Sequence, residues 1–171
     1  MTGFDGIERA RELLENADRV LIGAGAGLST AAGITMDGPR FQKAFAPFIE
    51  RYGFTDLYSA GFYPFPTPSD KWAFWAQRIW FNRIAPGATS LYHLLLDWVR
   101  ERDYFVITTN VDAQFELAGF DPQRIFATQG DYAYIQCARE CHDRIYPADE
   151  LVREWRVDLG ARPDGTLERT R

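Results

Sequence analysis

Apolar residues near the start of the chain follow first a helical and then a strand-like pattern. The first of them recur at helical spacing: Ile7, Ala10, Leu14 and Ala17. Glu and Arg residues lie between them, so the pattern predicts an amphipathic helix that ends near Asn16. A short apolar run at 19–22 predicts a strand, which leads into a glycine cluster at 23–29. We expect a second helix to start at about Ser29, so this region is typical of a strand, a glycine turn and a helix.

The same alternation returns after residue 88. Thr89 or Ser90 can cap a helix, whose apolar face consists of Leu91, Leu94, Leu95 and Trp98. The runs at 104–107 and 125–127 predict two further strands, separated by a short helix that Gly119 ends. This order predicts an α/β fold with a Rossmann-like parallel sheet and helices on both faces. Because a complete doubly wound domain has about six strands, the predicted sheet is partial.

Residues 41–86 interrupt this alternation with an aromatic-rich insertion. Several of its residues recur at helical spacing: Trp72, Trp75, Ile79 and Arg83. Pro64, Pro66 and Pro68 predict a loop before that helix. We expect a helical insertion with a small core of its own, and the alternative is that its aromatic side chains contact a substrate. Phe41 poses the same choice between packing in a helix and shielding a bound ligand.

Composition and charge narrow the classes of partner. The chain has 171 residues, 46% of them hydrophobic, and a formal net charge of −5. Its Lys and Arg residues are scattered among acids, which disfavours nucleic acid as a partner. No segment approaches the roughly 20 apolar residues of a membrane helix, and the charged first helix is unlike a signal peptide. Together with only two cysteines, this predicts a cytoplasmic protein without a disulfide framework.

The glycine cluster is the first candidate site. A turn rich in glycine lets backbone amides approach a pyrophosphate at the start of a helix. The spacing departs from the usual dinucleotide-binding pattern, because Leu28 or Thr30 stands where a third glycine would be. The alternative is a tight strand-to-helix connection with no ligand.

Four segments in order carry a resemblance to a known family. They are residues 25–34 (Gly-Ala-Gly-Leu-Ser, then Gly-Ile), 109–112 (Thr-Asn-Val-Asp), 128–130 (Thr-Gln-Gly) and the pair Cys137 and Cys141. The chain resembles the sirtuins, which carry Gly-Ala-Gly-x-Ser with Gly-Ile, Gln-Asn-x-Asp, His-Gly and a first zinc-binding cysteine pair at these places. The resemblance covers nearly all of residues 1–171 but only the first half to two-thirds of a sirtuin. It therefore implies an incomplete NAD-binding domain, and we expect a truncated product or a fragment.

The resemblance also implies roles for single residues. The pyrophosphate end of NAD would contact the turn residues Gly25, Ala26, Gly27 and Ser29. Asn110 would contact the nicotinamide-side ribose and position the attacking group, Asp112 would hold the nicotinamide carboxamide, and Gln129 would orient the same ribose. Thr109, which stands where sirtuins have glutamine, belongs to the same NAD-binding set. The alternative for Asn110 and Asp112 is that they cap a helix after a strand.

Gln129 departs from the common sirtuin pattern in a way that bears on the reaction. It replaces the histidine that common sirtuins use as general base, and a carboxamide cannot accept a proton from a ribose hydroxyl. With Thr109 and residues 131–132 (Asp-Tyr), it makes the chain most like the macrodomain-linked sirtuins. That class implies an NAD-dependent protein ADP-ribosyltransferase, with a lipoyl-carrier protein as acceptor and a macrodomain hydrolase as partner. The alternatives are a protein deacylase that tolerates glutamine, and a non-catalytic fragment that binds NAD or ADP-ribose.

A partial zinc module is expected at residues 132–150. Cys137 and Cys141 would supply one of the two cysteine pairs of the sirtuin zinc site, and residues 160–165 resemble the loop that leads to the second pair. A closed structural zinc site takes four ligands. His142 is a candidate third ligand and the sequence offers no fourth, so the alternative is that these residues bind no metal.

Overall fold

The computed structural model describes residues 3–170, and its centre is a parallel sheet with the strand order β1–β2–β3. The strands are β1 (Arg19–Ala24), β2 (Asp103–Thr108) and β3 (Ile125–Ala127). Leu21 lies opposite Phe105, and Val106 lies opposite Ile125. Three helices flank the sheet: α2 (Ala26–Ala31), α7 (Ser90–Val99) and α8 (Gln114–Ala118). The predicted α/β class with a parallel sheet is therefore confirmed.

Helix α2 begins at Ala26, so the predicted start near Ser29 was wrong. Strand β1 continues to Ala24, two residues beyond the apolar run, and Gly25 alone makes the turn in an extended conformation. The glycines at 23–27 concealed this boundary because Gly is the poorest helix former after proline. The first turn of α2 consequently consists of residues that the sequence placed in a loop.

The helices cover only one face of the sheet in the part of the chain that the structure describes. Side chains of all three flanking helices and of the strands form one core cluster: Tyr92, Val99, Tyr104, Val106, Phe115, Ala118 and Phe120, with Val20, Ile22 and Leu28 against it. On the opposite face Leu21 is 67% exposed and Phe126 is 57% exposed, and Phe105 and Ile107 are also exposed. The predicted coverage of both faces is thus wrong within residues 3–170, although both faces are apolar, as is typical of parallel sheets.

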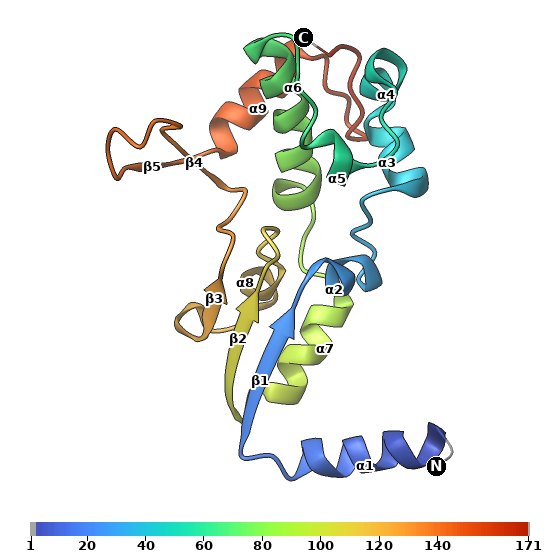
Figure 1. Ribbon diagram of the computed structural model, residues 1–171, viewed down its shortest axis with the longest axis vertical. Helices are drawn as coiled ribbons and strands as arrows, with labels where there is room; N and C mark the ends of the chain where they lie inside the picture. The colour runs from blue at the N-terminus through green and yellow to red at the C-terminus, as the bar shows by residue number, and fades with distance from the viewer. Residues whose placement is uncertain (1–2, 171) are drawn as a thin grey trace.

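Helix α1 (Gly3–Glu15) confirms the predicted N-terminal helix but not its burial. It extends away from the start of β1, and its apolar side chains Ile7 and Leu14 remain exposed (Figure 1). Its Glu and Arg residues form ion pairs along the helix, such as Arg11–Glu8 at 3.1 Å. Exposed pairs of this spacing stabilise a helix by only about 0.2–0.5 kcal/mol each.

A helical layer lies beyond the carboxyl ends of the strands (Figure 1). It contains α3 (Gly38–Ala44), α4 (Ala46–Tyr52), α5 (Leu57–Ala60), α6 (Pro68–Ile79) and a π-helical turn (Trp80–Ile84). Pro68 starts α6 and the Thr67 hydroxyl accepts a hydrogen bond from the Asp70 amide, a favourable N-terminus for this helix. The layer has the aromatic core that the sequence predicts: Phe41, Phe45, Phe48, Phe54 and Phe74 are all buried.

The last part of the chain completes this layer. Helix α9 (Asp149–Asp158), which the sequence analysis did not predict, packs on α6, and Leu159 and Leu167 join the aromatic core. Gln77 of α6 accepts a 2.8 Å hydrogen bond from Arg156 of α9 and donates a 2.9 Å bond to the Gly165 carbonyl. Residues 160–165 are therefore held against the helical layer, with Ala161 packed against the aromatic core and residues 162–164 exposed. Their few apolar residues are spaced too irregularly to reveal this in the sequence.

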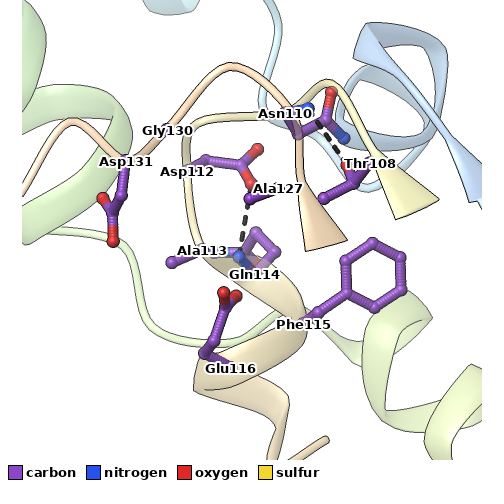
Figure 2. A pocket seen from close by; sticks show the side chains of 10 residues that line it. All are labelled: Thr108, Asn110, Asp112, Ala113, Gln114, Phe115, Glu116, Ala127, Gly130 and Asp131. Atoms are coloured by element: carbon purple, nitrogen blue, oxygen red, sulfur yellow. Dashed lines mark hydrogen bonds between the residues drawn. The ribbon is translucent and has the colours of Figure 1, made fainter. Parts of the chain in front are cut away.

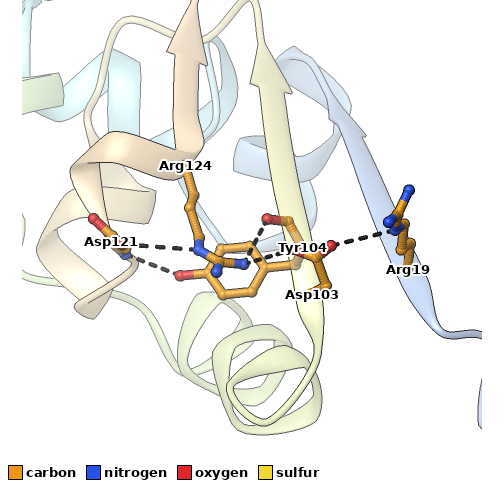
Figure 3. A network of polar contacts seen from close by, with 5 residues as sticks. All are labelled: Arg19, Asp103, Tyr104, Asp121 and Arg124. Carbon is orange, nitrogen blue, oxygen red and sulfur yellow. Dashed lines mark hydrogen bonds and ion pairs between the residues drawn. The ribbon is translucent and has the colours of Figure 1, made fainter.

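The amino ends of the strands are joined by a surface network of charges on the side away from the helical layer (Figure 3). Asp103 at the start of β2 pairs with Arg19 of β1 at 3.4 Å and with Arg124 at 3.1 Å. Arg124 ends the 3₁₀ turn Pro122–Arg124 before β3, and the Asp121 amide donates to the Tyr104 hydroxyl at 3.0 Å.

Among the described residues, no helix combines the length and the apolar character that a membrane span requires.

Candidate functional site

The loops after β1, β2 and β3 meet between the sheet and the helical layer, around a cavity of about 380 Å³. Most of the predicted site residues line this cavity: Ala26, Ser29, Thr109, Asn110, Asp112 and Gln129. Carboxyl ends of neighbouring parallel strands share one edge, where open α/β sheets bind their ligands. The cavity has the size of a small-molecule site, and its predicted lining residues come from three separate stretches of the chain, at 26–29, 109–112 and 129.

Ser29 and Asp112 form the buried centre of the site. The Ser29 hydroxyl, on α2, donates a 2.6 Å hydrogen bond to Oδ2 of Asp112, and both residues are buried. The other carboxylate oxygen of Asp112 accepts a 3.2 Å bond from the Gln114 amide at the start of α8 (Figure 2). The N-cap residue of α8 is Ala113, so Asp112 is not the cap residue that the alternative interpretation expected. Its side chain nevertheless connects the first amide of α8 to α2.

Asn110 is held by the glycine turn and by a residue that the sequence analysis missed. Its side-chain amide donates to the Gly25 carbonyl at 3.1 Å and to the Tyr92 hydroxyl at 3.3 Å. The Tyr92 hydroxyl also lies 3.2 Å from the Ser29 hydroxyl. Tyr92 is completely buried, and burial raises the pKa of its hydroxyl above the ordinary value. Tyr92 thus stays a neutral hydrogen-bonding group that joins α7 to both loops.

Gly25 permits the close approach of the first two loops. A Cβ atom built on Gly25 would lie 3.3 Å from the Thr109 hydroxyl oxygen, and the Thr109 amide donates to the Ala24 carbonyl at 3.0 Å. Gly27 has open space where its Cβ would be. A larger residue at position 25 would therefore push the first two loops apart, whereas a larger residue at position 27 would not.

Gln129 lies on the third loop and is exposed. The preceding residue is anchored, since both the amide and the hydroxyl of Thr128 donate to the Thr108 carbonyl, at 2.9 and 3.2 Å. Gly130 follows with a φ of 77°, a left-handed conformation that suits glycine. The loop therefore presents Gln129 to the cavity from a fixed strand end.

The helical layer supplies the opposite wall, through residues that the resemblance did not assign. Trp75, Arg78 and Asn82 of this layer and Tyr132 after β3 line the cavity. The Arg78 guanidinium lies over the ring of Trp75 at 4.9 Å and over the ring of Tyr132 at 5.7 Å. Aromatic and Arg residues at helical spacing were visible in the sequence, where a packing role explained them equally well.

Arg40 and Phe41 do not reach the cavity. Phe41 is buried in the aromatic core, and the Arg40 side chain donates to the carbonyls of Thr35 and Phe81 and to Asn82. Burial lowers the pKa of Arg40 to about 10, which leaves it positively charged at neutral pH. The packing interpretation of Phe41 is the one that the structure supports.

The two cysteines lie on a separate hairpin formed by the antiparallel strands β4 (Tyr134–Gln136) and β5 (Ile145–Pro147). The sulfur atoms of Cys137 and Cys141 are 3.1 Å apart. With a His142 nitrogen they form a group of ligand atoms within 4.8 Å of one another. A closed structural zinc site needs four ligands, so these three residues fit one face of such a site and do not complete it.

Comparisons with known proteins bear on the origin of this arrangement. No protein-family model matches the chain. It is 36% identical over 147 residues to a protein ADP-ribosyltransferase of Staphylococcus aureus (strain Mu50), which covers 86% of the chain and 47% of that protein. It is 35% identical over 150 residues to a probable bifunctional ADP-ribose hydrolase/ADP-ribosyltransferase of Fusarium oxysporum f. sp. cubense, covering 85% of the chain and 25% of that protein. The chain thus spans less than half the length of either relative.

Solved structures are similar to the chain in fold. A Sir2 homologue in complex with NAD superimposes with a TM-score of 0.59 at 17% identity, over 82% of this chain and 51% of that one. Such low identity is informative about the fold alone. The chain therefore has the fold of the Sir2 homologue, and over 85–86% of its length it is similar in sequence to proteins named as ADP-ribosyltransferases.

Proposed function

We propose that the chain is the NAD-binding part of a sirtuin-type enzyme that transfers ADP-ribose to a protein acceptor. One observation carries the proposal: Asn110, Asp112 and Gln129 line the same cavity as Ser29 of the glycine turn. The two relatives named as ADP-ribosyltransferases support the same reaction class.

The residues present fit NAD. The cavity of about 380 Å³ is lined by small residues on the glycine-turn side and by hydrogen-bonding side chains on the loop after β2. When bound, NAD would supply the ADP-ribosyl group, with nicotinamide as the leaving group. Gly25, Ala26, Gly27 and Ser29 would hold the pyrophosphate side, with Thr109 beside them. Their backbone amides suit an anionic group at the start of a helix.

Three side chains would divide the remaining work. Asn110, fixed by Gly25 and Tyr92, would contact the nicotinamide-side ribose and position the acceptor. Asp112, fixed by Ser29, would hold the carboxamide of the leaving group. Gln129 would donate or accept a hydrogen bond at a ribose hydroxyl, and it cannot remove that proton because a carboxamide has no accessible pKa. The site is therefore suited to group transfer more than to deacylation, in which that hydroxyl is deprotonated.

Titration of NAD into the purified chain, followed by calorimetry, tests the proposal first. We expect saturable binding that Asn110→Ala weakens, and Thr30→Ala, an exposed neighbour of Ser29, serves as the control that leaves it unchanged. Nicotinamide release in the presence of candidate acceptor proteins then tests transfer. A folded chain that binds no NAD would contradict the proposal for this chain.

Two other functions remain distinct candidates. A deacylase would turn over an acyl-lysine peptide, and Gln129→His would raise its rate. A non-catalytic module would bind NAD or ADP-ribose without releasing nicotinamide.

The partners of the reaction belong to the proposal as well. A lipoyl-carrier protein as acceptor and a macrodomain hydrolase as partner follow from the family resemblance. The name of the Fusarium relative, which couples an ADP-ribose hydrolase to an ADP-ribosyltransferase, supports the second. A cytoplasmic location would keep Cys137 and Cys141 reduced. Zinc bound by Cys137, Cys141 and His142 would have a structural role, because none of these three residues lines the cavity.

A further inference from the structure

The loop that carries Gln129 is tied to the helical layer by an ion pair. Nε of Arg83, in the π-helical turn after α6, donates to one oxygen of Asp131 at 2.7 Å, and its Nη2 donates to the other at 3.0 Å. The side chains of Arg83 and Asp131 are 19% and 24% exposed. This two-pronged geometry is the one in which an Arg–carboxylate pair is both strong and directional. The hydrogen bonds to Asp131 raise the pKa of Arg83, so its guanidinium stays positively charged.

The residues next to Asp131 are also held in place. Its Oδ1 also accepts a 2.7 Å hydrogen bond from the Ala133 amide, and the Tyr132 amide donates to the Val111 carbonyl at 3.1 Å. The ring of Tyr132 packs edge-on against Trp75 of α6, with 5.6 Å between ring centroids. The segment after Gln129 therefore contacts α6, the π-helical turn and the loop that carries Asn110 and Asp112.

Gln129 lies between two anchors of different origin. Thr128 on one side is bonded to the end of β2, and Asp131 on the other side is bonded to Arg83. Gly130 between them adopts a left-handed conformation that gives the loop freedom once an anchor is lost. In Figure 2 the loop runs past Asp112 and Asn110, with Asp131 at its far end.

We propose that Arg83 is a positioning residue of the NAD site, which holds Gln129 at the cavity by fixing Asp131. Arg83 does not line the cavity, so its effect passes through the loop. The inference rests on the proposed function only in taking NAD as the ligand that Gln129 contacts.

Amide hydrogen exchange of the chain without any ligand tests the anchoring step. Arg83→Gln should lower the protection of the Tyr132 and Ala133 amides at least about tenfold, because both amides lie on the segment that Arg83 would release. Amides of β2 should be unchanged. In Arg83→Lys, which retains one charge-assisted bond, the protection of the Tyr132 and Ala133 amides should lie between that of the wild type and that of Arg83→Gln. The matched control is Arg124→Gln, which removes an ion pair to Asp103 at the opposite end of the sheet. Unchanged protection in Arg83→Gln would overturn the inference.

A double-mutant cycle on NAD affinity tests the link to Gln129. Arg83→Gln and Gln129→Ala should each weaken NAD binding by a similar factor, about fivefold or more, and the double variant should be no weaker than the single ones. Additive losses would show that Arg83 acts independently of Gln129, which contradicts the proposal. If the wild-type chain binds no NAD, the proposed function fails, while the exchange measurement still decides whether Arg83 anchors the loop.

Discussion

The Ser29 hydroxyl lies 2.6 Å from the Asp112 carboxylate, although 83 residues separate the two in sequence. This hydrogen bond joins α2, which follows β1, to the loop after β2. Both residues are buried and line the cavity. A hydrogen bond to a charged group in such a place contributes more to stability than an exposed one. The pair is therefore both a candidate binding element and a structural connection.

Removal of the Ser29 hydroxyl should destabilise the chain. Ser29→Ala leaves one oxygen of the buried Asp112 carboxylate without this donor, which costs about 1–3 kcal/mol. Urea unfolding followed by circular dichroism measures this loss of stability. The control is Thr30→Ala on the exposed side of the same helix, which should change the free energy of unfolding by less than about 0.5 kcal/mol. Equal effects of the two substitutions would contradict the assigned role of Ser29.

Tyr92→Phe should weaken NAD binding without changing the fold. It removes the hydroxyl to which Asn110 donates and which lies beside Ser29, while its ring can keep its contact with Phe115 at 4.9 Å. We expect a loss of stability of about 1 kcal/mol and a lower affinity for NAD in calorimetry. An affinity equal to that of the wild type would show that Asn110 is positioned without Tyr92.

The same residue should give the chain a pH dependence in alkaline solution. Burial raises the pKa of Tyr92 in the folded state, so above pH 10 the unfolded chain loses this proton first. The unfolded state then binds fewer protons than the folded state, and stability falls as pH rises. Tyr52, whose pKa is also raised, contributes in the same direction. Unfolding free energies measured between pH 9 and about 11 should therefore fall less steeply in Tyr92→Phe than in the wild type.

Gln129 should decide which reaction the site favours. Gln129→His introduces an imidazole that can act as a general base near neutral pH. We expect it to raise any turnover of an acyl-lysine peptide and Gln129→Ala to lower ADP-ribose transfer, both measured as nicotinamide released from NAD. Gln129→Asn keeps the carboxamide on a shorter side chain. It therefore shows whether the length of the side chain matters in addition to the amide group. A Gln129→Ala variant that transfers ADP-ribose at the wild-type rate would remove this residue from the proposed site.

The two faces of the sheet should respond differently to the same substitution. Phe115→Ala, in helix α8 against the covered face, should cost about 3–5 kcal/mol because Phe115 is 1% exposed. Phe126→Ala, on the face where Phe126 is 57% exposed, should cost less than about 1 kcal/mol. Thermal and urea unfolding of the isolated chain measure both. A large loss in Phe126→Ala would mean that this face is covered in solution.

The cysteine hairpin should hold zinc weakly. Three ligands leave one coordination position to water, so EDTA should remove zinc readily, and the midpoint of thermal unfolding should stay unchanged. A metal-indicator dye measures release, and Cys137→Ser should abolish what binding there is. Zinc that withstands EDTA would show that a fourth ligand completes the site.

Local patterns were sufficient for the individual elements and for the residue types at the site. Helical spacing predicted α1, α6 and α7, and apolar runs predicted the three strands. The segments at 25–29, 109–112 and 128–130 were identified through the resemblance to sirtuins, and each of them follows a predicted strand. Their presence on one cavity wall follows from the parallel sheet, since the carboxyl ends of its strands share an edge.

Only the tertiary structure decided which elements cover one another. The apolar faces of α1 and of the sheet look like core positions in the sequence, yet Ile7 and Leu21 are exposed in the described chain. The spacing of apolar residues indicates that an element has an apolar face, but it does not indicate which element, if any, packs against that face. Tyr92 and Arg83 likewise looked like helix-face residues, and their contacts with Asn110 and Asp131 arise between segments 18 and 48 residues apart. Hydrogen bonds over such separations depend on how the elements pack, which the spacing of residues within one element does not encode.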